Sequence, residues 1–162
     1  MTILKIEAVE QAGAWNAALR ALPYAHILQT WEWGEFKRQT TGWQPQRWVF
    51  RQGGEIVALA SVGVRRVGPF CVMYAPKGPV FAREEVDPDV WAAVLTALEA
   101  EARRQRAIWL KLDPDLPAAT GVPGEPDDQR DPAGQAWIAM SQARGWRFSA
   151  DHVQFRNTIV LE

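Results

Sequence analysis

The residue types that most often carry chemistry are sparse in this chain. Cys71 is the only cysteine, and the two histidines are His26 and His152. A nucleophilic cysteine needs a basic partner to form its thiolate, whereas the apolar neighbours of Cys71 are typical of a buried strand thiol. The chain has no Gly-x-Ser-x-Gly elbow, no Walker loop and no pair of histidines at helical spacing. The sequence therefore predicts no catalytic constellation and no metal site.

Two segments partly match a pyrophosphate-binding loop. The loop has the pattern Arg/Gln-x-x-Gly-x-Gly/Ala, and acyltransferases of the GNAT type place it before a helix N-terminus. The segments Arg65–Phe70 and Gln142–Arg147 follow this pattern up to the last position, where a large residue replaces the small one. We therefore expect no binding of acetyl-CoA, and no cofactor.

The composition indicates one soluble globular domain. The 162 residues are 48% hydrophobic and 23% charged, which allows a sizeable buried core. A formal net charge of -1 gives no global basic field for nucleic acid. The single cysteine favours a reducing compartment, the start Met1–Glu10 lacks the apolar core of a signal peptide, and no apolar run reaches the roughly 18 residues of a membrane span. We expect a cytoplasmic protein.

Tryptophan is unusually frequent, with nine residues. Such rings bury large apolar area, so most are expected in the core and at its rim. The alternative is that some of them line a groove for an extended substrate.

Helical periodicity appears twice near the N-terminus. The stretch Ala12–Leu22 has apolar residues at helical spacing and stops at Pro23. Thr30 can cap a second helix from Trp31 to about Thr40. On this second helix three side chains share one face by their spacing: Trp33, Phe36 and Lys37.

The middle of the chain predicts strands followed by a helix. Gly53-Gly54 joins two strand-like segments into a hairpin, and a third apolar strand completes an antiparallel meander; the three segments are Gln46–Arg51, Glu55–Val67 and Phe70–Tyr74. A helix then starts at Asp87-Pro88 and runs to about Arg106. These elements predict the α/β (α+β) class, with a mixed, mainly antiparallel sheet flanked by helices.

The C-terminal part alternates strand, loop and helix signals. Ile108–Leu112 predicts a strand, and Asp113–Pro132 is rich in Pro, Gly and Asp, as in a long loop. Ala133–Ala143 predicts a further helix, and Asn157–Glu162 has the composition of a strand.

Four segments stand out together by their order and spacing. They are Gln29-Thr30-Trp31-Glu32-Trp33-Gly34-Glu35-Phe36-Lys37, Tyr74-Ala75-Pro76-Lys77-Gly78-Pro79, Lys111-Leu112-Asp113-Pro114 and Asn157-Thr158-Ile159-Val160-Leu161. In series they resemble the FemABX family of peptidoglycan interpeptide-bridge transferases. The resemblance implies that residues 1–162 form a single GNAT-like domain, the N-terminal half of a longer two-half transferase.

The resemblance also implies the substrates. The family passes an amino acid from aminoacyl-tRNA to a peptidoglycan precursor, which is a UDP-linked or lipid-linked muramyl peptide. The first half would bind the precursor, and aminoacyl-tRNA would be held through a second half that is missing here. The isolated chain is therefore expected to be inactive.

The resemblance assigns the candidate binding residues. Lys37 corresponds to the family lysine one turn beyond a tryptophan, which here is Trp33, and its compact ammonium suits a phosphate. Tyr74 is expected to border the same groove. Lys37 could instead be a solvated residue at a helix end, and the turn Pro76–Pro79 favours a structural role for Lys77.

A second function remains open. The missing acyl-CoA loop and the chain end within a strand are also compatible with a non-catalytic binding or scaffold module that retains the GNAT-like fold.

Overall fold

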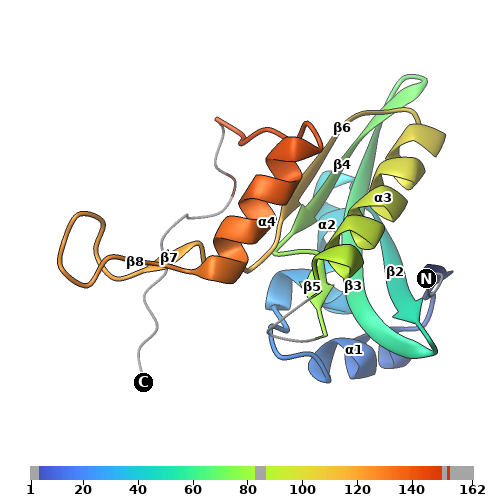
Figure 1. Cartoon of the computed structure of the whole chain (residues 1–162). Coiled ribbons are helices and arrows are strands. Elements are labelled where there is room, and N and C mark those ends of the chain that lie inside the picture. The colour runs from blue at the N-terminus through green and yellow to red at the C-terminus, as the bar shows by residue number, and fades with distance from the viewer. Residues whose placement is uncertain (1–3, 83–86, 151–152, 154–162) are drawn as a thin grey trace. The chain divides into compact units, whose positions relative to one another are not determined.

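The computed structural model describes residues 4–82, 87–150 and 153. The chain divides into two compact units, Met1–Pro117 and Ala118–Glu162, which are described separately. Figure 1 shows the elements in chain order from blue to red. The expected strand at Asn157–Glu162 lies outside the described residues.

A six-stranded sheet forms the first unit. Its main path runs in the order β1-β2-β3-β4-β6, and β5 pairs with β3 beyond the end of β4. Neighbouring strands are antiparallel except β4 and β6, which are parallel. The strands are β1 (Leu4–Ala8), β2 (Gln44–Gln52), β3 (Glu55–Val67), β4 (Phe70–Pro76), β5 (Val80–Phe81) and β6 (Ala107–Asp113). The expectation of a mixed, mainly antiparallel sheet is confirmed.

Helix α3 (Pro88–Arg104) covers one face of this sheet. Asp87 caps the helix by accepting a hydrogen bond from Asp89 N–H, and Pro88 occupies the first turn, as the sequence predicts. The apolar stripe of α3 packs over alternate residues of β2, β3 and β4, which are buried at 0–6% exposure. The fully buried members of this layer include Phe50, Val62, Cys71, Met73, Val94 and Leu98.

The opposite face is covered over β2 and β3 by three short helices. They are α1 (Ala12–Arg20), the 3-10 helix η1 (Ile27–Gln29) and α2 (Trp31–Thr41). Six buried side chains from α1, the sheet and their connections form a second apolar cluster, namely Trp15, Leu19, Leu22, Val49, Leu59 and Val80. Both faces of β3 are therefore buried at its centre, which explains its uninterrupted run of Val, Ala and Leu.

The second unit contains a short hairpin and one helix. The hairpin pairs β7 (Ala119–Thr120) with β8 (Gln129–Arg130), and α4 (Pro132–Ala143) is capped by Asp131. The expectation of an unbroken loop from Asp113 to Pro132 is therefore wrong in part. The prediction of a helix at Ala133–Ala143 is confirmed.

The tryptophans divide between core and surface. Trp15, Trp48 and Trp91 are buried, whereas Trp109 on β6 is 44% exposed. The other five are half-buried. Among the described residues, no helix is long and apolar enough to cross a membrane.

Candidate functional site

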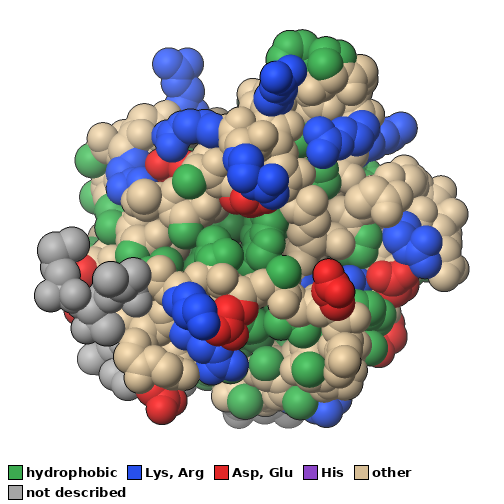
Figure 2. All heavy atoms as spheres, turned by 90° about the vertical axis from the view of Figure 1, so that its right-hand side faces the viewer, with side chains coloured by type: hydrophobic (Ala, Val, Ile, Leu, Met, Phe, Trp, Pro, Cys, Tyr) green, Lys and Arg blue, Asp and Glu red, His purple; other side chains and the backbone are tan. Residues whose placement is uncertain are grey.

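A hollow of about 330 Å³ opens where β1 ends. Within the part of the chain that the structure describes, β1 pairs with Trp48–Gln52 of β2, and the first residues of β2 have no strand partner on that side. Figure 2 shows the hollow with hydrophobic side chains at its floor and charged side chains around it. Its lining includes Val9, Trp31, Glu35, Arg47, Glu101 and Arg104.

Arg47 at this hollow fastens α2 to the sheet. Its guanidinium lies 3.6 Å from the ring centre of Trp31 and donates to the Trp31 carbonyl oxygen (3.0 Å) and to Glu35 Oε1 (3.1 Å). Its side chain is 5% exposed, and burial lowers the pKa of Arg47 while Glu35 opposes that shift. The contact requires a glycine at position 34, because an added Cβ would lie 2.6 Å from Arg47 Nη2 and 2.9 Å from Pro45 Cβ. Trp31, Gly34 and Glu35 of the first motif are thus structural residues.

Gln29 joins the first motif to the second. Its Nε2 donates to the carbonyl oxygens of Ser61 (3.1 Å) and Pro76 (2.6 Å), and its Oε1 accepts from Ser61 N–H (2.7 Å). The pairing of β3 with β4 stops at Gly63 and Tyr74, two residue pairs before Ser61 and Pro76 would meet. The buried amide of Gln29 therefore fills the point where the two strands separate, in place of a peptide group.

The second and third motifs meet at the carboxyl ends of the parallel strands β4 and β6. Asp113 N–H donates to Gly78 O at 3.1 Å, and Gly78 lies so close to Gln29 that an added Cβ would be 2.7 Å from its Nε2. Lys77, which directly precedes Gly78 in this turn, has a φ of 52°. Three of the four motif segments thus contact one another, although they are distant in the sequence.

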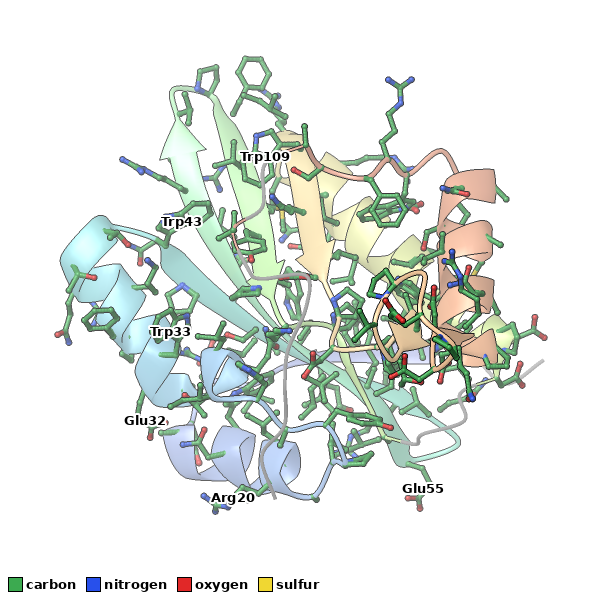
Figure 3. The ribbon with its side chains drawn as sticks, turned by 90° about the vertical axis from the view of Figure 1, so that its left-hand side faces the viewer. Arg20, Glu32, Trp33, Trp43, Glu55 and Trp109 are labelled. Carbon is green, nitrogen blue, oxygen red and sulfur yellow. The ribbon has the colours of Figure 1, made fainter. Side chains whose placement is uncertain are left out.

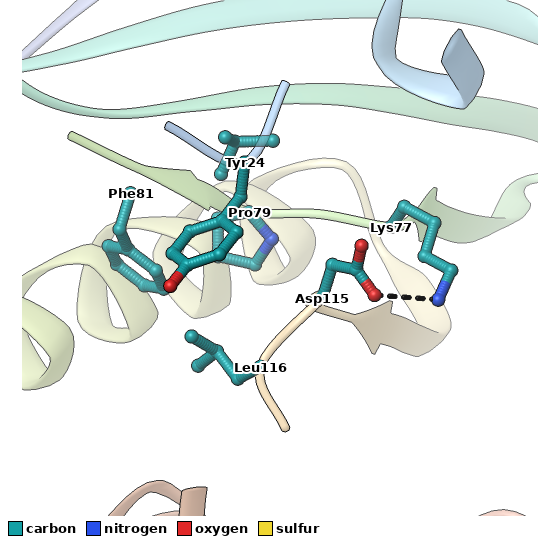
Figure 4. Close-up of a pocket in the computed structure, with 7 residues that line it drawn as sticks. Tyr24, Lys77, Pro79, Phe81, Asp115 and Leu116 are labelled. Carbon is teal, nitrogen blue, oxygen red and sulfur yellow. Dashed lines mark hydrogen bonds and ion pairs between the residues drawn. The ribbon is translucent and has the colours of Figure 1, made fainter. Parts of the chain in front are cut away.

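Lys77 forms an ion pair at this turn. Its Nζ lies 2.8 Å from Asp115 Oδ1, and the side chains of Lys77 and Asp115 are 15% and 46% exposed. Figure 4 shows this pair at the edge of a hollow of about 10 Å³, room for one water, next to Tyr24, Phe81 and Leu116. Burial lowers the pKa of the neighbouring His26, and Asp115 opposes that shift. The ion pair orders the turn, in line with the structural role expected for Lys77.

The predicted residues Trp33 and Lys37 lie together on α2. Thr30 Oγ1 accepts from Trp33 N–H at 3.2 Å and so caps the helix, which ends at Gly42 with a φ of 74°. The Lys37 ammonium lies 5.7 Å from the centre of the Trp33 ring, within the range of a cation–π contact. Both side chains are half-buried. The predicted helical spacing is therefore confirmed.

The third predicted residue, Tyr74, lies on the part of the sheet that α1 and α2 leave open. It pairs in register with Gly63 on β3 and with Lys111 on β6. Its hydroxyl donates to Asp113 Oδ2 at 3.4 Å, and Lys111 Nζ lies 5.9 Å from the ring centre.

Trp43 and Trp109 extend this face, and neither was singled out by sequence reasoning. The Trp43 ring covers Gly63, where an added Cβ would meet it at 3.1 Å, and Trp109 pairs in register with Val72. Figure 3 looks onto this side, with Trp33, Trp43 and Trp109 labelled on α2, before β2 and on β6. We call the set Trp43, Tyr74, Trp109 and Lys111 the open sheet face. The sequence gives no sign that Gly63 lies under the Trp43 ring, because this contact can be recognised only once the strand register is known.

The other expectations concern absent chemistry. Cys71 is buried, and its Sγ lies 3.5 Å from Gln105 O, as expected for a strand thiol. In the described ranges, no cluster of His, Cys, Asp and Glu is arranged to hold a metal ion. The segment Arg65–Phe70 forms a hairpin turn, and Gln142–Arg147 spans the end of α4 and the residues directly after it. The fourth motif, at Asn157–Leu161, lies outside the described residues.

Solved structures define the fold class. The crystal structure of FemX matches with a TM-score of 0.65 and 22% identity over 87% of this chain, which spans 31% of the FemX chain. An aminoglycoside acetyltransferase from an uncultured soil metagenomic sample matches with a TM-score of 0.53 and 12% identity. The match covers 96% of this chain and 99% of the acetyltransferase chain. An aminoglycoside 6'-N-acetyltransferase from Acinetobacter haemolyticus matches with a TM-score of 0.51 and 12% identity. The match covers 96% of this chain and 99% of the acetyltransferase chain. These likenesses confirm a GNAT-like α/β fold.

The family model identifies the family. The model of the FemAB family matches residues 16–162, and the chain therefore belongs to the FemAB family. A search of curated proteins found no match.

Proposed function

We propose that this chain is the N-terminal, precursor-binding half of a FemABX-like aminoacyltransferase. In this function an amino acid passes from aminoacyl-tRNA to a UDP-linked or lipid-linked muramyl peptide, and a second half holds the tRNA. Membership of the FemAB family supports the reaction class. The observation that carries the binding role is the lysine held over a tryptophan on α2.

The charge of Lys37 is available to a ligand. Among the described residues Lys37 takes part in no salt bridge, whereas the side chain of Lys77 is engaged by Asp115. A cation over an aromatic ring retains its three donors for an anion that approaches from the other side. We therefore assign the precursor phosphates to Lys37, with Trp33 fixing the position of the ammonium.

The open sheet face supplies aromatic area for the rest of the precursor. Tyr74 and Lys111 place a hydroxyl and an ammonium beside the rings of Trp43 and Trp109. Such rings bind the apolar surfaces of sugars and side chains, while polar groups set orientation. We propose that Tyr74 contacts the part of the muramyl peptide beyond the phosphates.

The test is calorimetric titration of a UDP-linked muramyl pentapeptide into the wild-type chain and variants. Lys37→Ala should weaken binding by about 5- to 150-fold, corresponding to about 1 to 3 kcal/mol for a charge-assisted contact. The loss should shrink as salt rises. Lys5→Ala, at an exposed lysine on β1, is the matched control and should bind like the wild type. Equal affinities for Lys37→Ala and the wild type would remove Lys37 from the site.

One observation favours a second function. The chain spans 99% of the length of two aminoglycoside acetyltransferases but 31% of the length of FemX. A non-catalytic binding or scaffold module would have this form. An assay with charged tRNA separates the two functions: transfer in the presence of a second half supports the first, and binding without transfer supports the second. Product from the chain alone would contradict both.

A further inference from the structure

The hairpin between β3 and β4 projects beyond the rest of the sheet. Pairing of β2 with β3 ends at Val64, and pairing of β6 with β4 begins at Cys71. Among residues 4–82, 87–150 and 153, the segment Arg65–Phe70 therefore has strand partners only within the hairpin itself. This projecting end is the green hairpin at the top of Figure 1. We call Arg65–Phe70 the hairpin tip.

The hairpin tip carries exposed apolar side chains. Val67 and Phe70 form the last pair before the Gly68-Pro69 turn and are 52% and 48% exposed. Strand alternation places them on the same face as Val72, next to which Trp109 of β6 is 44% exposed. Single exposed apolar residues are ordinary on a protein surface, but a group gathered on one projecting edge indicates an interaction site.

Arginines lie on both faces of the hairpin, with Arg65 on the face of Val67 and Arg66 on the opposite face. Arg66 Nη1 donates to Gln105 O at 3.4 Å, and Cys71 N–H donates to Arg106 O at 3.3 Å, so the end of α3 lies against the base of the hairpin. Arg65, Arg66 and Arg106 are exposed, and none of the three has an acidic partner among the described residues. Figure 2 shows hydrophobic side chains capping the top of the view, with basic side chains below them.

We propose that the hairpin tip is a docking site for an anionic lipid surface. Apolar side chains on a projecting turn can enter the acyl boundary, while arginines next to them meet the negative headgroups. A protein with net charge -1 gains this attraction only through a local basic cluster. RNA fits less well, because sequence-tolerant RNA binding uses a basic groove with stacking rings, whereas Val67 is aliphatic and stands at a tip.

Docking of the hairpin tip on a lipid surface would affect which form of the muramyl peptide reaches the open sheet face. The hairpin tip and the open sheet face share one side of β4, from Phe70 to Tyr74. If the proposed precursor-binding function holds, docking brings that face to the lipid surface and favours the lipid-linked acceptor. The docking itself does not depend on that function, because it is measured without any precursor.

The experiment is flotation of the full chain with vesicles of phosphatidylglycerol and phosphatidylcholine, compared with phosphatidylcholine alone. We expect binding to the anionic vesicles, weakened by salt. Each arginine near such a surface contributes about 5-fold, so the double variant Arg65→Gln/Arg66→Gln should bind about 25-fold more weakly. Val67→Thr/Phe70→Thr, which retains strand propensity, should also weaken binding.

Matched controls lie away from the tip. Arg20→Gln changes an exposed arginine at the opposite end of the first unit, labelled in Figure 3, and Ile27→Thr changes an apolar residue that is 70% exposed on η1. Both should bind as the wild type, and melting curves should show all variants folded. The proposal is overturned if anionic vesicles do not bind, if the controls lose as much binding as the tip variants, or if an RNA duplex alone binds with the same arginine dependence.

Discussion

Gln29→Ala tests whether the first family motif is there to build the fold. The substitution removes three hydrogen bonds, to Ser61 O, to Pro76 O and from Ser61 N–H, at a site where Gln29 is 0% exposed. A buried polar group left without a partner costs about 1 to 3 kcal/mol. With three groups affected, the free energy of unfolding should fall by at least about 3 kcal/mol.

The measurement is urea unfolding followed by tryptophan fluorescence. Gln39→Ala is the matched control, because Gln39 is an exposed glutamine on the following helix α2 and should change stability by less than about 0.5 kcal/mol. Gln29→Glu refines the test, since a carboxylate retains the acceptor for Ser61 N–H but faces the Pro76 carbonyl oxygen with another acceptor. That variant should be more stable at acid pH, where the carboxyl is protonated, than at neutral pH. If Gln29→Ala and Gln39→Ala unfold alike, the amide does not hold β3 and β4 at their point of separation.

Three further predictions address α2 and the cofactor. Gly34→Ala should lower the free energy of unfolding by about 1 to 3 kcal/mol in urea melts, because its Cβ would meet Arg47 Nη2 at 2.6 Å; equal stability would refute the packing argument. The hydrogen bonds from Arg38 and then Arg47 lower the pKa of Glu35, so its stabilising effect is complete above the ordinary carboxyl pKa and is lost as pH falls through the folded value. Glu35→Gln should therefore flatten the acid side of a stability–pH curve, and an unchanged curve would contradict this. Calorimetry with acetyl-CoA should show no saturable binding, and micromolar affinity would refute the prediction from the incomplete loops.

Local signals predicted the elements whose ends are marked by special residues. Gly53 and Gly54 adopt φ values of 62° and 92°, which fixes the turn between β2 and β3, and Asp87-Pro88 marks the start of α3. Strands without such marks were missed. β1 is an edge strand with alternating charges, and β5 has two residues whose pairing depends on β3. The parallel pairing of β6 with β4 is a tertiary arrangement that periodicity does not encode.

Residues with a long-range partner were the hardest to predict. The sequence marked Gln29 only as the first residue of a family motif, and Arg47 only as part of the predicted strand Gln46–Arg51. Their burial follows from contacts with Ser61 and Trp31, which are 32 and 16 positions away. A polar side chain is stable in a core only when its partners are in place. Sequence alone therefore underestimates how much of a family motif serves the fold.

The same contacts divide the first motif by role. Gln29, Trp31, Gly34 and Glu35 hold α2 against the sheet through hydrogen bonds, ring stacking and close approach. Trp33 and Lys37 lie on the same helix but contact each other instead of the sheet residues that fix these four. Among the described residues the half-buried Lys37 takes part in no salt bridge, so no ion pair of the fold requires a lysine at this position. Trp33 and Lys37, which contact each other, are the two motif residues that the precursor-binding proposal requires.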